Sequence, residues 1–153
     1  MLGELNEMQI DHFLLSQAVG RIACTDGKRP YIVPVTYVYD GKDIIGQAKE
    51  GMKVEIMRAN PNVCFEVDAM ANMANWPSVI LFCTFRELKG KEAQKLRDYL
   101  FNHLSPLLTS STIHPHEHEV SGKPDDSNRI KPVMYRIKIK EKSGRFEKSD
   151  SNK

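Results

Sequence analysis

Residues 46–53, read as Gly-Gln-Ala-Lys-Glu-Gly-Met-Lys, combine the residue types that bind an anion. A strand is predicted to end before this turn, and a helix is predicted to start at Gly51. The first turn of a helix exposes backbone N–H groups at the positive end of its macrodipole, which favours a phosphate. Lys49 and Lys53 would add positive charge there, and Gly51 would let the backbone come close. The alternative interpretation is a solvated turn, which is the more common environment for such lysines.

A second group that could do chemistry is the run His114-Pro115-His116-Glu117-His118. Imidazoles two residues apart can reach one metal ion in an extended loop. The rest of the sequence offers no evident fourth ligand, so we predict no metal site. A histidine lying over a bound small molecule is the better functional interpretation, and a solvated polar loop is the alternative.

The elements that must position these residues follow from hydrophobic periodicity, which predicts six strands and three helices. Asp26-Gly27 and Asp40-Gly41 are hairpin signals, so the first three strands are predicted to form an antiparallel meander. The predicted strands are residues 21–25, 31–39, 43–48, 62–68, 78–88 and 133–140. The predicted helices run from the Asn6 cap to about Ala18, over 51–59 and over 91–104. Residues 105–131 are predicted to form a long loop.

Composition limits the function classes. The chain has 153 residues, 22 Lys and Arg against 20 Asp and Glu, and a formal charge of +2, which argues against nucleic acid as a partner. The longest apolar stretch is too short to span a bilayer, and the N-terminus does not look like a signal peptide. Three widely spaced cysteines (Cys24, Cys64 and Cys83) favour a reducing cytoplasm. We predict one α+β domain over residues 1–145, followed by a polar C-terminal tail over residues 146–153. The chain is expected to be frayed from about residue 143.

Several short motifs occur in an order and spacing that resemble one known family. They are Arg21-Ile-Ala, Pro34-Val-Thr-Tyr-Val-Tyr39, Gly51-Met-Lys53, Asn60-Pro-Asn-Val-Cys-Phe-Glu-Val67, Asn75-Trp-Pro-Ser-Val79, Tyr135-Arg-Ile-Lys-Ile139 and Ser143-Gly-Arg145. Over residues 13–145 the chain resembles the pyridoxamine 5′-phosphate oxidase-related flavoproteins. Within them it is most similar to the branch that contains the nitroimidazole-resistance (Nim-type) proteins.

The resemblance implies a six-stranded antiparallel split β-barrel with flanking helices, which forms a homodimer and holds two FMN molecules in clefts between the protomers. FAD is the alternative cofactor. The implied contacts to the isoalloxazine edge come from Val33, Pro34, Val35, Thr36 and Tyr37. Gln47 and Lys53 are expected near the ribityl chain and phosphate. Trp76 and Ser78 are expected at the cleft, with Ser78 contributed by the partner chain; for Trp76, a packing or interface anchor is favoured over stacking on the flavin.

Two positions depart from the family pattern. Members often carry His where this chain has Gln47, and Arg where it has Pro77. Gln keeps its hydrogen-bonding groups but does not titrate near neutral pH, and proline supplies neither charge nor N–H. Flavin binding therefore survives these changes better than reductive chemistry does.

The resemblance implies a flavin-dependent oxidoreductase of small molecules, such as a nitroreductase or a pyridoxamine phosphate oxidase-like enzyme, with NAD(P)H as an electron donor. No residue can be assigned from the sequence as a catalytic acid or base. A flavin-binding carrier or sensor without catalytic activity is the main alternative. A dimeric barrel that has lost its flavin is the third interpretation.

Overall fold

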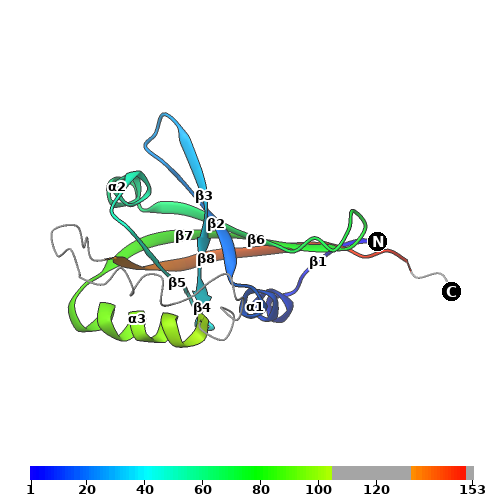
Figure 1. Ribbon diagram of the computed structural model, residues 1–153. Helices are drawn as coiled ribbons and strands as arrows, with labels where there is room; N and C mark the ends of the chain where they lie inside the picture. The colour runs from blue at the N-terminus through cyan, green and yellow to red at the C-terminus, as the bar shows by residue number, and fades with distance from the viewer. Residues whose placement is uncertain (105–131, 151–153) are drawn as a thin grey trace, which may run out of the picture.

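The computed structural model describes residues 1–104 and 132–150 (Figure 1). In these two segments three helices and eight strands follow one another along the chain. Their order is β1 (Leu2–Glu4), α1 (Glu7–Ser16), β2 (Val19–Thr25), β3 (Pro30–Thr36), β4 (Val38–Tyr39), β5 (Ile44–Ala48), α2 (Met52–Ala59), β6 (Asn62–Asp68), β7 (Trp76–Leu88), α3 (Gly90–Leu104) and β8 (Val133–Glu147).

The strands form one antiparallel sheet whose two ends are joined through a single residue. The strand order is β3-β2-β6-β7-β8-β5-β4, with β1 paired to β8. Only Tyr37 separates β3 from β4, although these strands stand at opposite ends of the sheet. Neighbouring strands are about 4.8 Å apart, so one residue cannot cross a flat sheet of this width. The sheet therefore curls into a barrel in which β3 contacts β5, and the α+β split-barrel prediction is confirmed.

The number of strands differs from the predicted six. β1 was not predicted, and the predicted strand 31–39 is divided into β3 and β4 at Tyr37. The Tyr37 N–H donates to the Ala18 carbonyl (2.9 Å), so the residue leaves the ladder where the chain turns from one end of the sheet to the other. The predicted three-strand meander is therefore interrupted, because β3 pairs with β2 and β4 pairs with β5.

The predicted frayed tail after residue 143 is also wrong in part. β8 continues to Glu147, paired with β7 along its whole length and with β1 near its end. Pairing on both sides satisfies the backbone groups of a segment whose side chains are polar. The Phe146 ring lies over Gly3, where an added Cβ would come within 2.5 Å of it.

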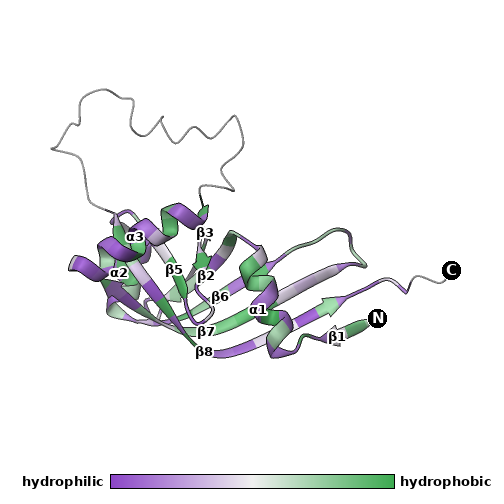
Figure 2. Ribbon diagram, turned by 90° about the horizontal axis from the view of Figure 1, so that it is seen from below, coloured by the Kyte–Doolittle hydropathy of each residue, from purple (hydrophilic) through white to green (hydrophobic). Residues whose placement is uncertain are grey.

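The three predicted helices are confirmed, with ends shifted by a few residues. Asn6 caps α1 in a capping box, because its side chain accepts the Gln9 N–H (2.8 Å) and the Gln9 side chain accepts the Asn6 N–H (2.8 Å). Figure 2 shows α3 beside the sheet, and its contacts are with β4, β5 and β8. None of the helices in the described segments has the length and apolar composition needed to cross a membrane.

The interior consists of two hydrophobic clusters on opposite faces of β5. The larger cluster fills the barrel and includes Ile22, Phe65 and Leu81. The smaller cluster lies beneath α3 and includes Ile45 and Met134. A strand presents alternate side chains to opposite faces, so the cluster to which a residue belongs tells which way its side chain points.

One part of the sheet projects beyond the barrel, and we call it the arm. It comprises β1, the turn of residues 69–75, the Trp76 end of β7 and residues 145–150. Figure 1 shows the arm extending away from α2 and α3, with the N-terminus beside it. The barrel and the arm therefore share β7 and β8 but lie at their opposite ends.

Candidate functional site

The turn before α2 has the geometry predicted for an anion site at its helix end. Gly51 is the N-cap of α2, and no side chain caps the helix. Lys53 lies in the first turn and is half-buried, and burial lowers the pKa of its ammonium group below the usual value. Within the described segments, no carboxylate or other acceptor bonds to this ammonium group. Lys49 is exposed. An anion would stabilise a half-buried cation that has no partner, and the helix end favours the same negative charge.

A clamp of three charged side chains fixes this turn to the sheet. Arg58, in the last turn of α2, donates two hydrogen bonds to Glu50 (2.7 and 2.8 Å) and two to Glu87 at the end of β7 (2.7 and 2.8 Å). Glu50 immediately precedes the N-cap Gly51, so the bidentate pair holds the turn and the helix in one orientation.

The β3 residues predicted at the flavin ring divide between two faces of the strand. Val33, Val35 and Tyr37 face the barrel interior, whereas Pro34 and Thr36 are exposed on the outside. The Tyr37 hydroxyl donates to the Leu14 carbonyl (2.7 Å) and its ring packs edge-on against Phe65.

β3 is the end strand of the sheet and pairs only with β2. An edge strand presents a row of backbone N–H and C=O groups on its free side. The free edge of β3 can therefore offer backbone groups to a ligand.

The side chains of Gln47 and Lys53 do not point toward one site. Gln47 pairs in register with Met134, a member of the cluster beneath α3, and its side chain is exposed on that face of β5. Lys53 lies on α2, which packs against β2 and β7, and its pKa is influenced by the thiol of Cys24, a member of the barrel cluster. The two side chains predicted at the ribityl chain and phosphate therefore point to different faces of the sheet.

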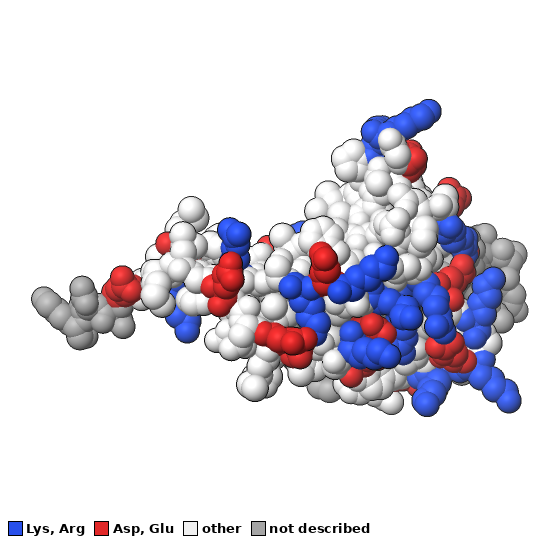
Figure 3. All heavy atoms as spheres, turned by 180° about the vertical axis from the view of Figure 1, so that it is seen from behind, with Lys and Arg blue, Asp and Glu red and all other residues white. Residues whose placement is uncertain are grey.

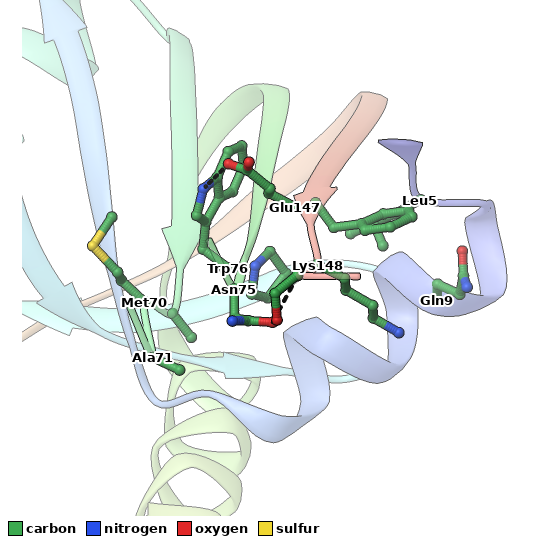
Figure 4. A pocket seen from close by; sticks show the side chains of 12 residues that line it. Leu5, Gln9, Met70, Ala71, Asn75, Trp76, Glu147 and Lys148 are labelled. Atoms are coloured by element: carbon green, nitrogen blue, oxygen red, sulfur yellow. Dashed lines mark hydrogen bonds between the residues drawn. The ribbon is translucent and has the colours of Figure 1, made fainter. Parts of the chain in front are cut away.

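Trp76 and Ser78 lie on the arm. Trp76 donates its indole N–H to Glu147 (3.2 Å) and forms one wall of a cavity of about 810 Å³ (Figure 4). Met70, Asn75 and Lys148 also line this cavity, so its walls combine apolar surface with an amide and a cation. Lys53 and Gln47 do not line this cavity.

A single chain does not bring the predicted residues into one site. Glu87, which bonds to α2 through Arg58, lies near one end of β7, and Trp76 lies at the other. At about 3.3 Å per residue, the 13 residues of β7 extend up to about 40 Å. The barrel-end group, at β3 and α2, and the arm group, at Trp76, are therefore two separate half-sites.

The outward face of β3, β2, β6 and β7 carries apolar side chains that no described element covers. Ile32, Ala23, Cys64 and Phe82 are register partners in a row across the four strands. Ile32 is 65% exposed and Phe82 is 51% exposed. A second row contains Ile80, which is 39% exposed. We call this surface the outer face.

A charged cluster that the sequence reasoning missed lies in the outer face. Arg21 on β2 donates to Glu66 (3.2 Å) and Asp68 (3.3 Å) on β6. Burial, together with the hydrogen bond and charge of Asp68, raises the pKa of Glu66 to about 7, against the opposing effect of Arg21. These residues are 45 and 47 positions apart, so only the strand pairing brings them together.

The His114–His118 run lies outside the described residues, so its predicted role stays a prediction. Within residues 1–104 and 132–150 no group of three or more metal-binding side chains occurs. The three cysteines are free: Cys24 and Cys83 are buried and Cys64 is partly exposed.

Comparison with known proteins identifies the family. The fold defines a split-barrel protein. The sequence profile of the family described as pyridoxamine 5′-phosphate oxidase matches residues 6–146, and the chain belongs to this family. An uncharacterised protein of Rhizobium meliloti is 34% identical over 74 residues, which are 48% of this chain. The matched segment spans about half of that relative's length (49%).

Solved structures share the fold over nearly the whole chain. An FAD-binding protein of Mesorhizobium loti is 27% identical, with a TM-score of 0.75, over 95% of this chain and 96% of its own. An FAD-binding protein of Mycobacterium smegmatis is 20% identical, with a TM-score of 0.62, over 94% and 98%. A Bacteroides thetaiotaomicron protein named for 5-nitroimidazole antibiotic resistance is 15% identical, with a TM-score of 0.68, over 95% and 87%.

Proposed function

We propose that this chain binds a flavin nucleotide as a homodimer and acts as an oxidoreductase of small molecules. The observation that carries the proposal is Lys53, a half-buried ammonium group without a partner in the described segments, at the open N-terminus of α2. The family and the FAD-binding relative of Mesorhizobium loti support a flavin. The FMN portion, which FMN and FAD share, satisfies this charge with its phosphate.

The residues at the barrel end fit a flavin in charge and in shape. Lys53 and the α2 N–H groups hold the phosphate, and the Arg58 clamp keeps them in place. The free edge of β3 offers backbone donors and acceptors to the polar edge of the ring, with Pro34 and Thr36 facing outward beside it. A bound flavin supplies hydride or electron transfer, and the protein binds and orients it.

A second copy of the chain completes the site. The outer face buries its apolar rows against the same face of the partner, an isologous arrangement that is the commonest in dimers. The partner's arm then brings Trp76 and Ser78 to the flavin, which the chain's own arm does not reach. The cavity beside Trp76 would admit the small-molecule substrate, with NAD(P)H as electron donor.

A non-catalytic carrier or sensor is the second candidate, and one observation favours it. The resemblance places Gln47 and Pro77 where many family members have His and Arg, and within the described residues the Cys24 thiol is the titratable group that influences the pKa of Lys53. Burial raises the pKa of that thiol, so Cys24 is a poor proton donor or base at neutral pH. The three free cysteines support a cytoplasmic location for either candidate.

The absorbance spectrum of the purified protein tests flavin binding directly. We expect flavin bands and about one flavin released per chain on denaturation. A colourless protein that also takes up neither FMN nor FAD at micromolar concentration would contradict the proposal. Anaerobic addition of NADH or NADPH, followed by a nitroaromatic acceptor, separates the two candidates. Bleaching and reoxidation with turnover support the enzyme, whereas a bound flavin that neither nucleotide reduces supports the carrier.

A further inference from the structure

The arm cavity, of about 810 Å³, is within the size range of small-molecule sites. Its lining is largely apolar: Leu5, Pro77 and Phe146 supply the larger side chains, and Ala69 and Ala71 supply small ones. Such walls favour an apolar ligand. The polar groups that remain free among them decide which functional group that ligand carries.

Two polar side chains of the wall already have partners within the chain. Asn75 accepts the N–H and the hydroxyl of Ser149 (3.1 and 3.2 Å) and donates to Asn72 (2.9 Å). Glu147 accepts the indole N–H of Trp76 (3.2 Å). The amide of Asn75 is therefore fully used, and Glu147 is held against the indole.

Strand alternation separates Glu147 from the cation of the wall. Trp76 pairs in register with Glu147. Pro77 and Phe146 form the next pair, so their side chains point to the opposite face of the arm. The Lys148 ammonium group lies 5.7 Å from the centroid of the Phe146 ring, on the Phe146 side. The Glu147 carboxylate is therefore directed away from Lys148.

The free polar groups on the Phe146 side of the described wall are both donors. Within residues 1–104 and 132–150, the ammonium group of Lys148 has no hydrogen bond or ion pair. Gln9, on α1, uses its amide oxygen to accept the Asn6 N–H (2.8 Å), so its NH2 group remains available. Figure 4 shows the Lys148 side chain extending toward α1, from which Gln9 projects.

An ammonium group and an amide NH2 group match the two oxygens of a carboxylate. Lys148 would donate a charge-assisted hydrogen bond, and Gln9 would donate a neutral one. A phosphate monoester carries nearly two negative charges, for which this side of the cavity has a single cation. A ligand ammonium group would meet donors only. The apolar walls would hold the body of the acid.

We infer that the arm cavity binds a carboxylic acid with an apolar body, whose carboxylate Lys148 and Gln9 hold. The substrate of the proposed oxidoreductase then belongs to this class, a step that rests on the proposed function. Binding of the acid itself does not depend on a bound flavin.

Calorimetric titration with phenylacetate and with its neutral amide, phenylacetamide, tests the inference. We expect wild type to bind the acid at least about tenfold more tightly than the amide, the effect of one charge-assisted contact. Lys148→Met should reduce acid affinity to the amide level and leave amide affinity unchanged. Gln9→Glu keeps the acceptor of the α1 capping box but places a carboxylate beside the ligand, so it should weaken acid binding alone.

Lys138→Met is the matched control. Lys138 is an exposed lysine of β8 that lies in the barrel, opposite Thr84. Figure 3 shows that most basic side chains on one face of the molecule gather over the barrel and not on the arm. An acid attracted by this general charge would lose affinity in the control, whereas an acid bound in the arm cavity would not.

A wild-type protein that does not bind the acid, or that binds acid and amide equally, would overturn the inference. So would a Lys148→Met protein that still prefers the acid, or an acid preference that Lys138→Met removes. Unchanged amide affinity shows that each variant keeps the cavity. The absorbance spectrum tests flavin binding separately: a protein that binds the acid but takes up no flavin would refute the proposed function and leave the cavity assignment standing.

Discussion

The barrel end and the arm are two half-sites built from opposite kinds of interaction. At the barrel end, charges and backbone groups are fixed by a clamp with four hydrogen bonds, and Lys53 is left with a charge to satisfy. On the arm, Trp76 and Met70 form the apolar part of a cavity whose walls also carry the charged Glu147 and Lys148. The barrel end suits a phosphate and the edge of a polar ring, whereas the arm suits an apolar substrate or the face of a ring. The comparison shows why the proposed flavin site needs two chains, because the barrel end and the arm of one chain lie at opposite ends of β7.

Disrupting the outer face should separate the two chains and thereby abolish flavin binding at both composite sites. We expect Phe82→Asp to raise the dimer dissociation constant by at least about thirtyfold, because losing a central aromatic anchor costs about 2 kcal/mol or more. Light scattering should show wild type at twice the 17.5 kDa of one chain and the variant at 17.5 kDa, with flavin lost.

Phe101→Asp is the matched control for this change. Phe101 is also a well exposed phenylalanine (59%), but it lies on α3, away from the outer face. We expect this variant to stay dimeric. A dimeric Phe82→Asp protein with bound flavin would place the interface elsewhere.

The two lysines of the α2 turn test the barrel end alone. Lys53→Ala should weaken FMN binding by about 1.5–3 kcal/mol, the net value of a hydrogen bond to a charged group, and Lys49→Ala by much less. Riboflavin lacks the phosphate, so its affinity should be the same for both variants. Equal FMN affinities for the two variants, measured by fluorescence titration, would mean that the phosphate lies elsewhere.

Mixed dimers test whether the half-sites meet across the interface. If Lys53 of one chain and Trp76 of the other share a flavin, a Lys53→Ala chain paired with a Trp76→Ala chain forms one intact site and one doubly damaged site. We expect the mixture, purified with two different tags, to bind about half of the wild-type flavin tightly. If both residues act in the same chain, every site in the mixed dimer carries one damaging change, and no tight binding returns.

The parts of the fold that depend on local signals could be predicted from the sequence. The Asn6 cap predicted the start of α1, and Asn60-Pro61 predicted the end of α2, each to within a few residues. The break at Tyr37 could not be predicted, because residues 31–39 form one apolar β-branched and aromatic run. Only closure of the barrel, a long-range event, divides this run into β3 and β4.

The end of β8 and the candidate site show the same limit. Residues 143–147 have a polar composition, and their strand structure depends on pairing with β7 and β1. The position of Lys53 in the first turn of α2 could be predicted, because a glycine turn before a helix is a local signal. The Arg21–Glu66–Asp68 cluster could not, because it forms only when β2 pairs with β6.

The Glu66 carboxyl should make the outer face sensitive to pH. Its pKa rises from the usual 4.5 to about 7 in the folded chain, mainly through burial and then through Asp68. The folded state therefore binds more protons than the unfolded state between these values, and the free energy of unfolding falls as pH rises through this window. Urea unfolding at pH 5 and pH 7.5 measures how much free energy of unfolding is lost over this window. We expect Glu66→Gln to reduce that loss, by no more than about 1 kcal/mol because solvent partly screens the group. Glu92→Gln, in an exposed pair with Arg86, should leave the slope unchanged.

The smallest effect is expected at Gln47, where the chain departs from its relatives. From the sequence, Gln47→His is predicted to raise nitroimidazole reduction with little change in FMN affinity, because histidine titrates near neutral pH. In the structure Gln47 faces the α3 side of β5, whereas Lys53 faces the barrel cluster. A histidine there acts on a flavin held by Lys53 only if the ring lies on the α3 side. We therefore expect FMN affinity and the anaerobic nitroreductase rate between pH 6 and 8 to change less than twofold, about 0.4 kcal/mol. A nitroreductase rate of Gln47→His that rises severalfold as the pH falls below the pKa of the new histidine would contradict this expectation. It would mean that the flavin ring lies on the α3 side of β5.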